Sequence, residues 1–160
     1  MEKLSVTIIT KNEEKNIARC LESVKWADEI VVLDTNSTDR TVEICRQFTD
    51  QVFCVDWHGY GKQKNLCAGR TSNNWVLNID SDEEISSEGA EEIQAVLRGD
   101  SKYPVYQFPR KNFFAQRWVS YGGWYPDQTS RLYDKTQVSF TESQVHEKLV
   151  PNENVGSLKN

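Results

Sequence analysis

The chain has 160 residues and a net charge of −5. This length predicts one domain, 1–160, which buries roughly two thirds of the surface that its unfolded form exposes. The 19 Lys and Arg residues are scattered, so we do not expect nucleic acid as the main partner. Nothing resembles a signal peptide or a membrane span, which predicts a cytoplasmic protein.

The first 99 residues alternate between strand-like and helix-like segments. We expect strands at 4–10, 29–33, 52–55 and 75–79. Helices are expected at 17–24, at 62–68, around 87–97 with its end at Gly99, and in a segment that Thr38 or Asp39 caps and that carries apolar residues to Phe48. This alternation predicts an α/β fold, with a mostly parallel sheet covered by helices on both faces.

From Tyr103 onward the helical patterns stop. Strand-like pieces separated by Gly, Pro and Asp indicate a smaller region of mixed sheet and loops that closes over one end of the first half. The pieces lie at 105–108, 118–121, 129–133 and 138–140.

The cysteines predict neither a zinc site nor a redox pair. Their spacings are irregular, and none forms Cys-x-x-Cys. We expect reduced thiols in or near the core. The four residues are Cys20, Cys45, Cys54 and Cys67.

The most informative segment is the apolar run 75–79, which ends in Asp80-Ser81-Asp82. Carboxylates at i and i+2 of a strand point to the same face and can grip one divalent cation that carries a diphosphate. The alternative is an ordinary solvated turn, because turns are rich in Asp and Ser.

Polar clusters also follow the first two expected strands, at 10–12 and 34–39. In an open parallel sheet, ligands bind outside the carboxyl ends of the strands, so these clusters and 80–83 should share one edge. Asp34 ends an apolar strand, where its carboxylate could accept a hydrogen bond from a base or ribose. For 37–39, helix capping alone is an equally good explanation.

An ordered set of motifs resembles family 2 glycosyltransferases of the GT-A fold. Two further motifs, with Val145-His146-Glu147, are similar to the bacterial lipopolysaccharide core glucosyltransferase branch. Members of the family commonly continue past that motif, so we expect a C-terminal truncation relative to them. The family motifs are Ser5 to Glu14, Asp34 to Asp39, Gly61 to Asn65 and Asp80 to Glu83, and the branch motifs are Gly123 to Asp127 and Arg131 to Tyr133.

The resemblance implies inverting transfer of a sugar from a nucleoside diphosphate donor. Glucose is the first candidate for the sugar, and UDP-glucose for the donor. Residues 1–99 would bind the donor and 100–160 the acceptor. Thr10, Asn12 and Asp34 match positions that hold the nucleoside, and we include the adjacent Glu13 as a substrate-binding candidate. Lys64 matches a basic position near the base or diphosphate. One departure concerns the base: the family usually has Ser-Gly or Asp-Gly where this chain has Thr35-Asn36.

The cofactor that the resemblance implies is Mg²⁺ or Mn²⁺. We expect Asp82 as a direct ligand and Asp80 as a ligand of metal or ribose. His146 is a third candidate ligand, although a lone histidine is more often structural. Arg131 is a candidate donor to the diphosphate, or a partner that holds Asp127.

Inverting transfer needs a general base on the face opposite the leaving group. Asp127 is the first candidate, since it follows a glycine-rich, Pro-containing turn and matches the family's downstream acidic position. Glu147 is the second. Trp124 is a candidate for stacking on a sugar ring, and packing is its alternative role.

The expected acceptor is a saccharide or glycolipid. Peripheral association with the inner face of the inner membrane would follow, with an edge around Phe113, Phe114 and Trp118. Two other functions remain open: a sugar nucleotidylyltransferase and a non-catalytic nucleotide-sugar-binding module. The first should have a Gly-rich loop after its first strand, where this chain has Lys11-Asn12-Glu13-Glu14.

Overall fold

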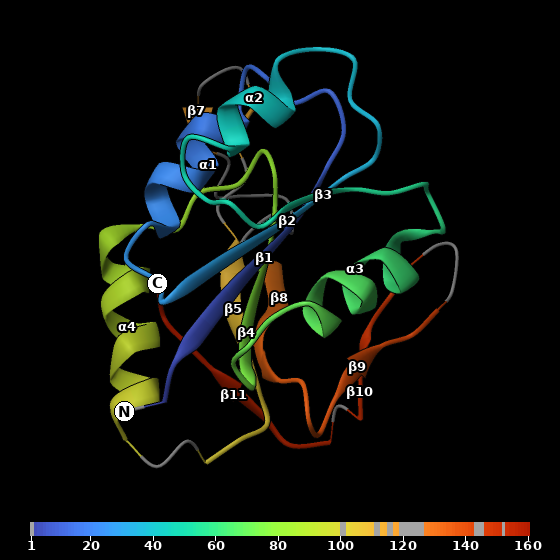
Figure 1. Ribbon diagram of the computed structural model, residues 1–160. Helices are drawn as coiled ribbons and strands as arrows, with labels where there is room; N and C mark the ends of the chain where they lie inside the picture. Colours follow the sequence, from blue (N-terminus) through green and yellow to red (C-terminus); the bar gives the residue numbers. More distant parts are fainter. Residues whose placement is uncertain are drawn as a thin grey trace.

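A seven-stranded sheet organises the computed structural model, with the order β11–β5–β8–β4–β1–β2–β3 (Figure 1). The structure describes residues 2–99, 102–110, 113–114, 117–118, 127–142, 146–151 and 153–160. The strands of this sheet are β1 (Leu4–Thr10), β2 (Glu29–Asp34), β3 (Val52–Cys54), β4 (Trp75–Asp80), β5 (Val105–Arg110), β8 (Asp127–Asp134) and β11 (Val155–Ser157).

The four strands expected in the first half form its parallel part. β1 is buried at every position, and its β-branched residues suit a strand that is covered on both faces. Thr10 lies opposite Asp34 on β2, and Ile9 lies opposite Asp80 on β4. The carboxyl ends of these strands therefore share one edge, which positions the site.

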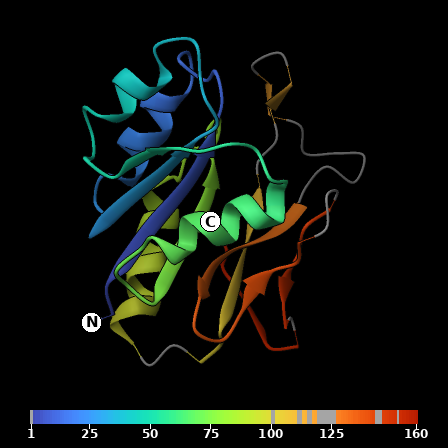
Figure 2. The ribbon, with the colours of Figure 1, turned by 45° about the vertical axis from the view of Figure 1, so that its right-hand side comes forward.

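Helices cover both faces of the sheet, as predicted (Figure 2). Apolar residues of α1, α2 and α4 join one large core cluster with β1 and β4. On the other face, Cys67 and Ala68 of α3 pack on residues of the sheet. The helices are α1 (Ile17–Val24), α2 (Thr41–Cys45), α3 (Tyr60–Gly69) and α4 (Ser87–Arg98), the last capped by Gly99.

The predicted helix through Phe48 is wrong in extent. α2 has five residues, with Arg40 at its N-cap, so neither Thr38 nor Asp39 is the cap residue. Asp39 instead accepts hydrogen bonds from the backbone and hydroxyl of Thr41. The chain turns after α2 because β3 begins at Val52, which leaves little length for more helical turns.

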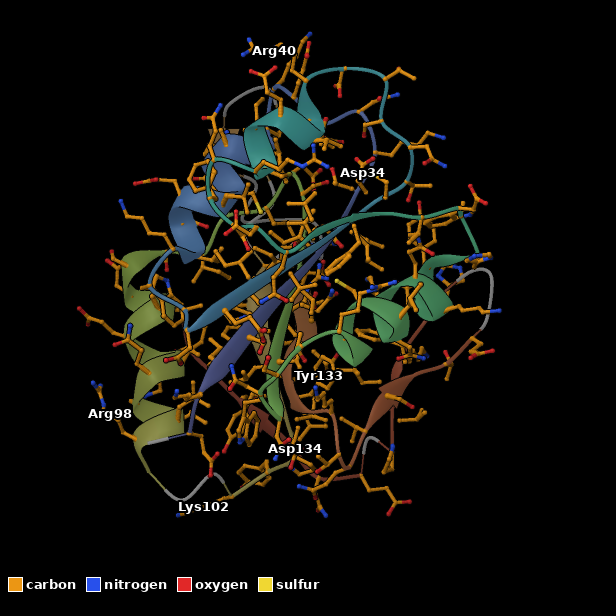
Figure 3. The ribbon with its side chains drawn as sticks, viewed as in Figure 1. Asp34, Arg40, Arg98, Lys102, Tyr133 and Asp134 are labelled. Atoms are coloured by element: carbon orange, nitrogen blue, oxygen red, sulfur yellow. The ribbon has the colours of Figure 1, made fainter. Side chains whose placement is uncertain are left out.

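The second half contributes three strands, β5, β8 and β11, to the main sheet. β8 pairs antiparallel with both β4 and β5 and so extends the main sheet. Its end at Asp134 lies at the edge opposite Asp34 (Figure 3). This pairing covers the edge of β4 that would otherwise expose unpaired backbone groups. Most of the predicted strand 118–121 lies outside the described residues.

Two short antiparallel pairs complete the second half. β9 (Ser139–Phe140) pairs with β10 (Leu149–Val150), and β6 (Phe113–Phe114) pairs with β7 (Arg117–Trp118). Phe140 and Leu149 join the core cluster on the face that carries α3. The smaller mixed β and loop region is therefore present, and the sequence patterns did not identify β10 or β11.

The cysteines are free thiols, and three of the four are buried. Burial raises the pKa of Cys67 to about 12 and that of Cys45 to about 12, which keeps both thiols protonated. Cys54 is exposed on β3. Among the helices in the described part of the chain, none has the length and apolar character needed to cross a membrane.

Candidate active site

A cleft of about 840 Å³ opens at the carboxyl ends of β1, β2 and β4, where the sequence placed the site. Its volume is typical of small-ligand pockets. A smaller cavity of about 410 Å³ lies near Lys3, Glu29 and Ser72, at the amino end of β2. The cleft is lined by Ile9, Thr10, Lys11, Glu13, Thr35, Trp57, Tyr60, Lys64, Asp80, Ser81, Asp82, His146 and Glu147.

Asp80 ends β4 between two cations. Arg131 donates a hydrogen bond to Oδ2 at 2.8 Å, and Lys64 Nζ lies 3.7 Å from Oδ1. The side chain of Asp80 is 38% exposed, so it also faces the cleft. Burial raises the pKa of Asp80, but the charges of Arg131 and Lys64 more than offset this, and its pKa lies below the ordinary value. Asp80 is therefore ionised, as a metal ligand must be.

Arg131 lies on β8, buried, and bridges two carboxylates. It donates to Asp80 and, at 2.7 Å, to Oε1 of Glu83. Burial lowers the pKa of Arg131, but the two carboxylates outweigh burial and hold it above the usual value. The predicted alternative that Arg131 pairs with Asp127 is wrong, because four residues along a strand separate them by about 13 Å.

Lys64 is buried on α3 and points its ammonium group into the same cluster. Nζ donates to Oε1 of Glu147 at 2.7 Å and lies 5.2 Å from the ring centre of Phe140. Gly61, one turn earlier, allows this close packing, since a Cβ there would lie 1.8 Å from the carbonyl oxygen of Thr141. Lys64, the basic residue predicted near the base or diphosphate, therefore lines the cleft and already pairs with two carboxylates.

The ion pairs continue from Glu83 to the first general-base candidate. Arg110 Nη1 lies 3.7 Å from Oε1 of Glu83, and Arg110 Nη2 donates to Oδ2 of Asp127 at 2.7 Å. Glu83 also accepts from the backbone N–H of Asp80 at 3.0 Å. We call this chain of alternating charges the ion-pair chain; it comprises Glu147, Lys64, Asp80, Arg131, Glu83, Arg110 and Asp127.

The two general-base candidates lie at the two ends of the ion-pair chain. Glu147 lines the cleft, whereas Asp127 is not among the described residues that line it. Each carboxylate has one cation beside it, Lys64 for Glu147 and Arg110 for Asp127. Trp124, the predicted sugar-stacking residue, lies outside the described residues.

Asp82 differs from Asp80 because it is exposed on the turn after β4 and has no ion-pair partner in the described part of the chain. In the described ranges, the structure contains no group of three or more His, Cys, Asp or Glu side chains that could hold a metal ion. Asp80, Asp82 and His146 line one cleft without forming such a group. Two carboxylates nevertheless supply the oxygen donors that suit Mg²⁺ or Mn²⁺.

Among the predicted nucleoside-binding residues, Thr10 and Glu13 line the cleft. The Thr10 hydroxyl is buried and has no hydrogen-bond partner in the described part of the chain. Asn12 and Asp34 do not belong to the lining that the structure describes. Asn12 accepts from the backbone of Thr38 at 2.8 Å, and its own N–H donates to the Ser37 hydroxyl.

Asp34 is fully buried and is used within its own loop. Its Oδ2 accepts from the backbone N–H of Ser37 at 2.7 Å, and Oδ1 accepts from the Ser37 hydroxyl. Asn12 therefore ties the loop after β1 to the loop after β2, and Asp34 holds the second loop in its turn. This arrangement matches the turn and capping chemistry that the sequence left open for 37–39.

Several residues of the site were missed by sequence reasoning. Trp57 and Tyr60 line the cleft, and the aromatic Trp57-His58-Gly59-Tyr60 segment after β3 was the available signal. Thr35 also lines the cleft. Glu83 was placed in the polar cluster at 80–83 without a role of its own, and the ion pairs of Glu83 and Arg110 were not predicted because they depend on the pairing of β8 with β4 and β5.

The fold is that of the GT-A glycosyltransferases. Over residues 5–147 the sequence matches Glycosyl transferase family 2, and the chain belongs to that family. The chain is 38% identical to "Uncharacterized glycosyltransferase RT0209" of Rickettsia typhi over 97% of its own length and 55% of that protein. It is 29% identical to the lipopolysaccharide core biosynthesis glycosyltransferase LpsC of Rhizobium meliloti, across 98% of this chain and 60% of LpsC.

Solved structures show the same fold. S. aureus TarS in complex with UDP-GlcNAc has a TM-score of 0.69 at 20% identity, over 98% of this chain and 56% of that one. Glucosyl-3-phosphoglycerate synthase of Mycobacterium tuberculosis, in complex with Mn²⁺, UDP and glucosyl-3-phosphoglycerate, has a TM-score of 0.55 at 23% identity, covering 67% of this chain and 43% of that one. The chain thus spans little more than half the length of RT0209, LpsC and TarS.

Proposed function

We propose that this chain transfers a sugar from a UDP-sugar to a saccharide or glycolipid acceptor with inversion at the anomeric carbon. Glucose is the first candidate for the transferred sugar. The observation that carries the proposal is the cleft at the carboxyl ends of the strands, which Asp80 and Asp82 both line and in which Asp80 lies 3.7 Å from the buried cation Lys64. The likeness of the fold to TarS with bound UDP-GlcNAc supports a nucleotide-sugar donor.

Asp82 and Asp80 are the residues that would hold Mg²⁺ or Mn²⁺. When bound, either ion supplies Lewis-acid stabilisation of the departing diphosphate. Arg131 and Lys64 keep Asp80 ionised and fix its direction. Lys64 also brings a positive charge to the cleft, where it can face a phosphate oxygen of the donor.

The decisive experiment measures UDP release from a panel of nucleotide sugars with Mn²⁺, with Mg²⁺ and with EDTA. We expect release from UDP-glucose with metal only, and a loss of at least about a hundredfold in Asp82→Ala, since a metal supplies several kcal/mol of transition-state stabilisation. Asp50→Ala is the control, because Asp50 is also exposed but far along the chain from the cleft. Equal release by Asp82→Ala and the unchanged chain would overturn the metal role.

The general base is tested by comparing Asp127→Asn with Glu147→Gln. The base variant should lose turnover while its Kd for UDP stays within about twofold, because the base contacts the acceptor hydroxyl and not the nucleotide. We propose Asp127 first, since inverting transfer needs a carboxylate on the acceptor side. If only Glu147→Gln loses turnover, Glu147 is the base.

For the acceptor we propose a saccharide or glycolipid of the cell envelope, and a cytoplasmic location at the inner face of the inner membrane. The likeness to LpsC supports this acceptor class. The proposed membrane edge around Phe113, Phe114 and Trp118 is tested by sedimentation with anionic lipid vesicles. An unchanged soluble fraction with and without vesicles would contradict membrane association.

Two alternative functions make different predictions in the same assays. A sugar nucleotidylyltransferase would release pyrophosphate from UTP and a sugar phosphate, and a binding module would show metal-dependent binding without UDP release. The loop after β1 carries Glu13 in the cleft and has no glycine, whereas a nucleotidylyltransferase requires a Gly-rich loop to cradle the triphosphate. Donor transfer therefore remains the proposal.

A further inference from the structure

The strands β9 and β10 bring two residues to the cleft without belonging to the main sheet. They form a two-stranded sheet of their own, and His146 and Glu147, which precede β10, line the cleft. A two-stranded ribbon is marginally stable by itself in water, so its place depends on what it packs against. We call β9, β10 and the described residues 141–142 and 146–148 between them the arm.

One face of α3 holds the arm. Gly61, Lys64, Asn65 and Ala68 follow one another at i, i+3, i+4 and i+7, so they lie on the same side of the helix. Figures 1 and 2 both show α3 beside β9, and the two elements are in contact. Ala68 shares a core cluster with Phe140 of β9. The motif at 61–65 that the sequence singled out therefore includes three of the four residues of this face.

Asn65 bonds to the arm as a neighbouring strand would. Its Nδ2 donates to the carbonyl oxygen of Phe140 at 2.8 Å, and its Oδ1 accepts from the N–H of Phe140 at 2.8 Å. Within the arm, the N–H of Thr141 donates to the carbonyl oxygen of Lys148 at 2.8 Å. Bonded and non-bonded pairs alternate along antiparallel strands, so the backbone groups of Phe140 point away from β10 and toward α3. The Asn65 amide satisfies both of them.

Gly61 and Lys64 complete the contact on either side of this amide. A Cβ on Gly61 would lie 1.8 Å from the carbonyl oxygen of Thr141, so only glycine allows the arm to come this close. Lys64 donates to Glu147 of the arm at 2.7 Å and lies 3.7 Å from Asp80. The contact with α3 thus places the Glu147 carboxylate against the buried cation of the cleft.

We propose that Asn65 is a positioning residue for the transfer reaction: its amide holds the arm on α3 and so keeps Glu147 beside Lys64 in the cleft. Glu147 then takes the acceptor proton or sets the direction of Lys64, and both roles need the arm in place. The effect on turnover rests on the proposed function, whereas the effect on the arm does not.

The first test is hydrogen exchange of the full chain, followed by mass spectrometry, in Asn65→Ala and Gly61→Ala. Alanine favours a helix more than asparagine or glycine does, so any weakening comes from the lost contact with the arm. We expect exchange in peptides covering β9 and β10 to be at least about tenfold faster, and exchange in β1 and β4 to stay within about twofold. Lys62→Ala, at an exposed position of α3, should change neither. Unchanged exchange of the arm in Asn65→Ala would overturn the proposal.

The second test separates turnover from nucleotide binding. For UDP release from UDP-glucose with Mn²⁺, the kcat of Asn65→Ala should fall at least about fivefold, and by the same factor as that of Glu147→Gln to within about threefold. The Kd for UDP with Mn²⁺ should stay within about threefold, because Lys64 and Asp80 belong to α3 and β4 and not to the arm. A general defect of the fold would weaken UDP binding as well.

The double variant Asn65→Ala/Glu147→Gln shows whether Asn65 acts through Glu147. Its kcat should lie within about twofold of that of Glu147→Gln, since residues that act as a unit are not additive. If Asn65→Ala turns over normally, or if its loss adds in full to that of Glu147→Gln, the positioning role is overturned and the proposed function stands. If the unchanged chain releases UDP from no nucleotide sugar, the proposed function fails and the role in turnover with it, while faster exchange in Asn65→Ala would still show that Asn65 holds the arm.

Discussion

The cleft has two sides that differ in how far their polar groups are satisfied by the protein itself. On the side of β4 and β8, Asp80, Arg131 and Lys64 pair with one another and with neighbouring glutamates. On the other side, Trp57 and Tyr60 are half exposed, and the Thr10 hydroxyl has no hydrogen-bond partner among the described residues. The charged side thus pairs its polar groups within the protein, whereas the aromatic side leaves such groups open to the cleft.

This difference predicts where mutations act. A ligand on the charged side has to compete with existing ion pairs, so changes there alter both stability and binding. A ligand on the aromatic side adds contacts that the protein lacks, so changes there alter binding alone. Asp82, exposed and without an ion-pair partner in the described ranges, is the exception on the charged side.

The largest effect on stability is expected for Arg131→Met. Removal of the guanidinium leaves Asp80 and Glu83 without their shared cation at a buried position. Such a loss costs about 3–5 kcal/mol for a fully buried pair, and we expect about 3 kcal/mol here because the Asp80 side chain is 38% exposed. Urea unfolding followed by circular dichroism measures the change.

Trp57→Ala is the matched variant for the aromatic side, and its unfolding free energy should change by less than about 1 kcal/mol because the side chain is half exposed. A smaller loss for Arg131→Met than for Trp57→Ala would invalidate the division of the cleft into a self-satisfied side and an open side.

A smaller effect is expected for Glu83→Gln. Glu83 accepts from Arg131 with one oxygen and from the backbone N–H of Asp80 with the other, whereas the amide of Gln has a single oxygen and no charge, so one of the two hydrogen bonds is lost and we expect a loss of at least about 1 kcal/mol of unfolding free energy. UDP release should also fall several-fold, since Arg131 and Arg110 lose their common anion. Glu84→Gln is the control, because Glu84 is exposed and, among the residues that the structure describes, pairs with the exposed Arg19. Equal effects of the two variants would count against a positioning role for Glu83.

The third prediction compares how salt concentration affects the binding of UDP and of uridine. Binding of UDP with Mn²⁺ should weaken about fivefold between 50 mM and 500 mM NaCl, because charges in an open cleft are screened. Uridine, which lacks the diphosphate, should change by less than about twofold, since it carries no net charge. Parallel salt dependence of the two ligands, measured by calorimetry, would show that the two sides are not separate.

The sequence predicted the charged side only in part. Asp80 and Asp82 were found because a buried strand ends at them, which is a local pattern. The ion pairs of Glu83 and Arg110 were not predicted, because they arise from the antiparallel pairing of β8 with β4 and β5, and register between distant strands has no local signature. Asp34 was predicted in the site because it ends a strand, yet its carboxylate accepts hydrogen bonds from Ser37 of its own loop.

The smallest effect concerns pH and again separates Asp80 from residues outside the cleft. The pKa of Asp80 in the folded chain is held below its unfolded value by Arg131 and Lys64, in spite of burial. A depressed pKa contributes stability above the unfolded pKa of about 3.9, and this contribution disappears as the pH falls through the folded pKa. The difference in unfolding free energy between the unchanged chain and Asp80→Asn should therefore be constant from pH 7 to pH 5 and shrink toward pH 2.

Asp50→Asn provides the reference for this titration, since Asp50 is exposed and outside the ion-pair chain. Its unfolding free energy should follow that of the unchanged chain at every pH, because an exposed carboxylate gains little from folding. A difference for Asp80→Asn that stays constant down to pH 2 would mean that Arg131 and Lys64 do not stabilise the Asp80 carboxylate. The charged side would then be as open to a ligand as the aromatic side, and the division between them would be lost.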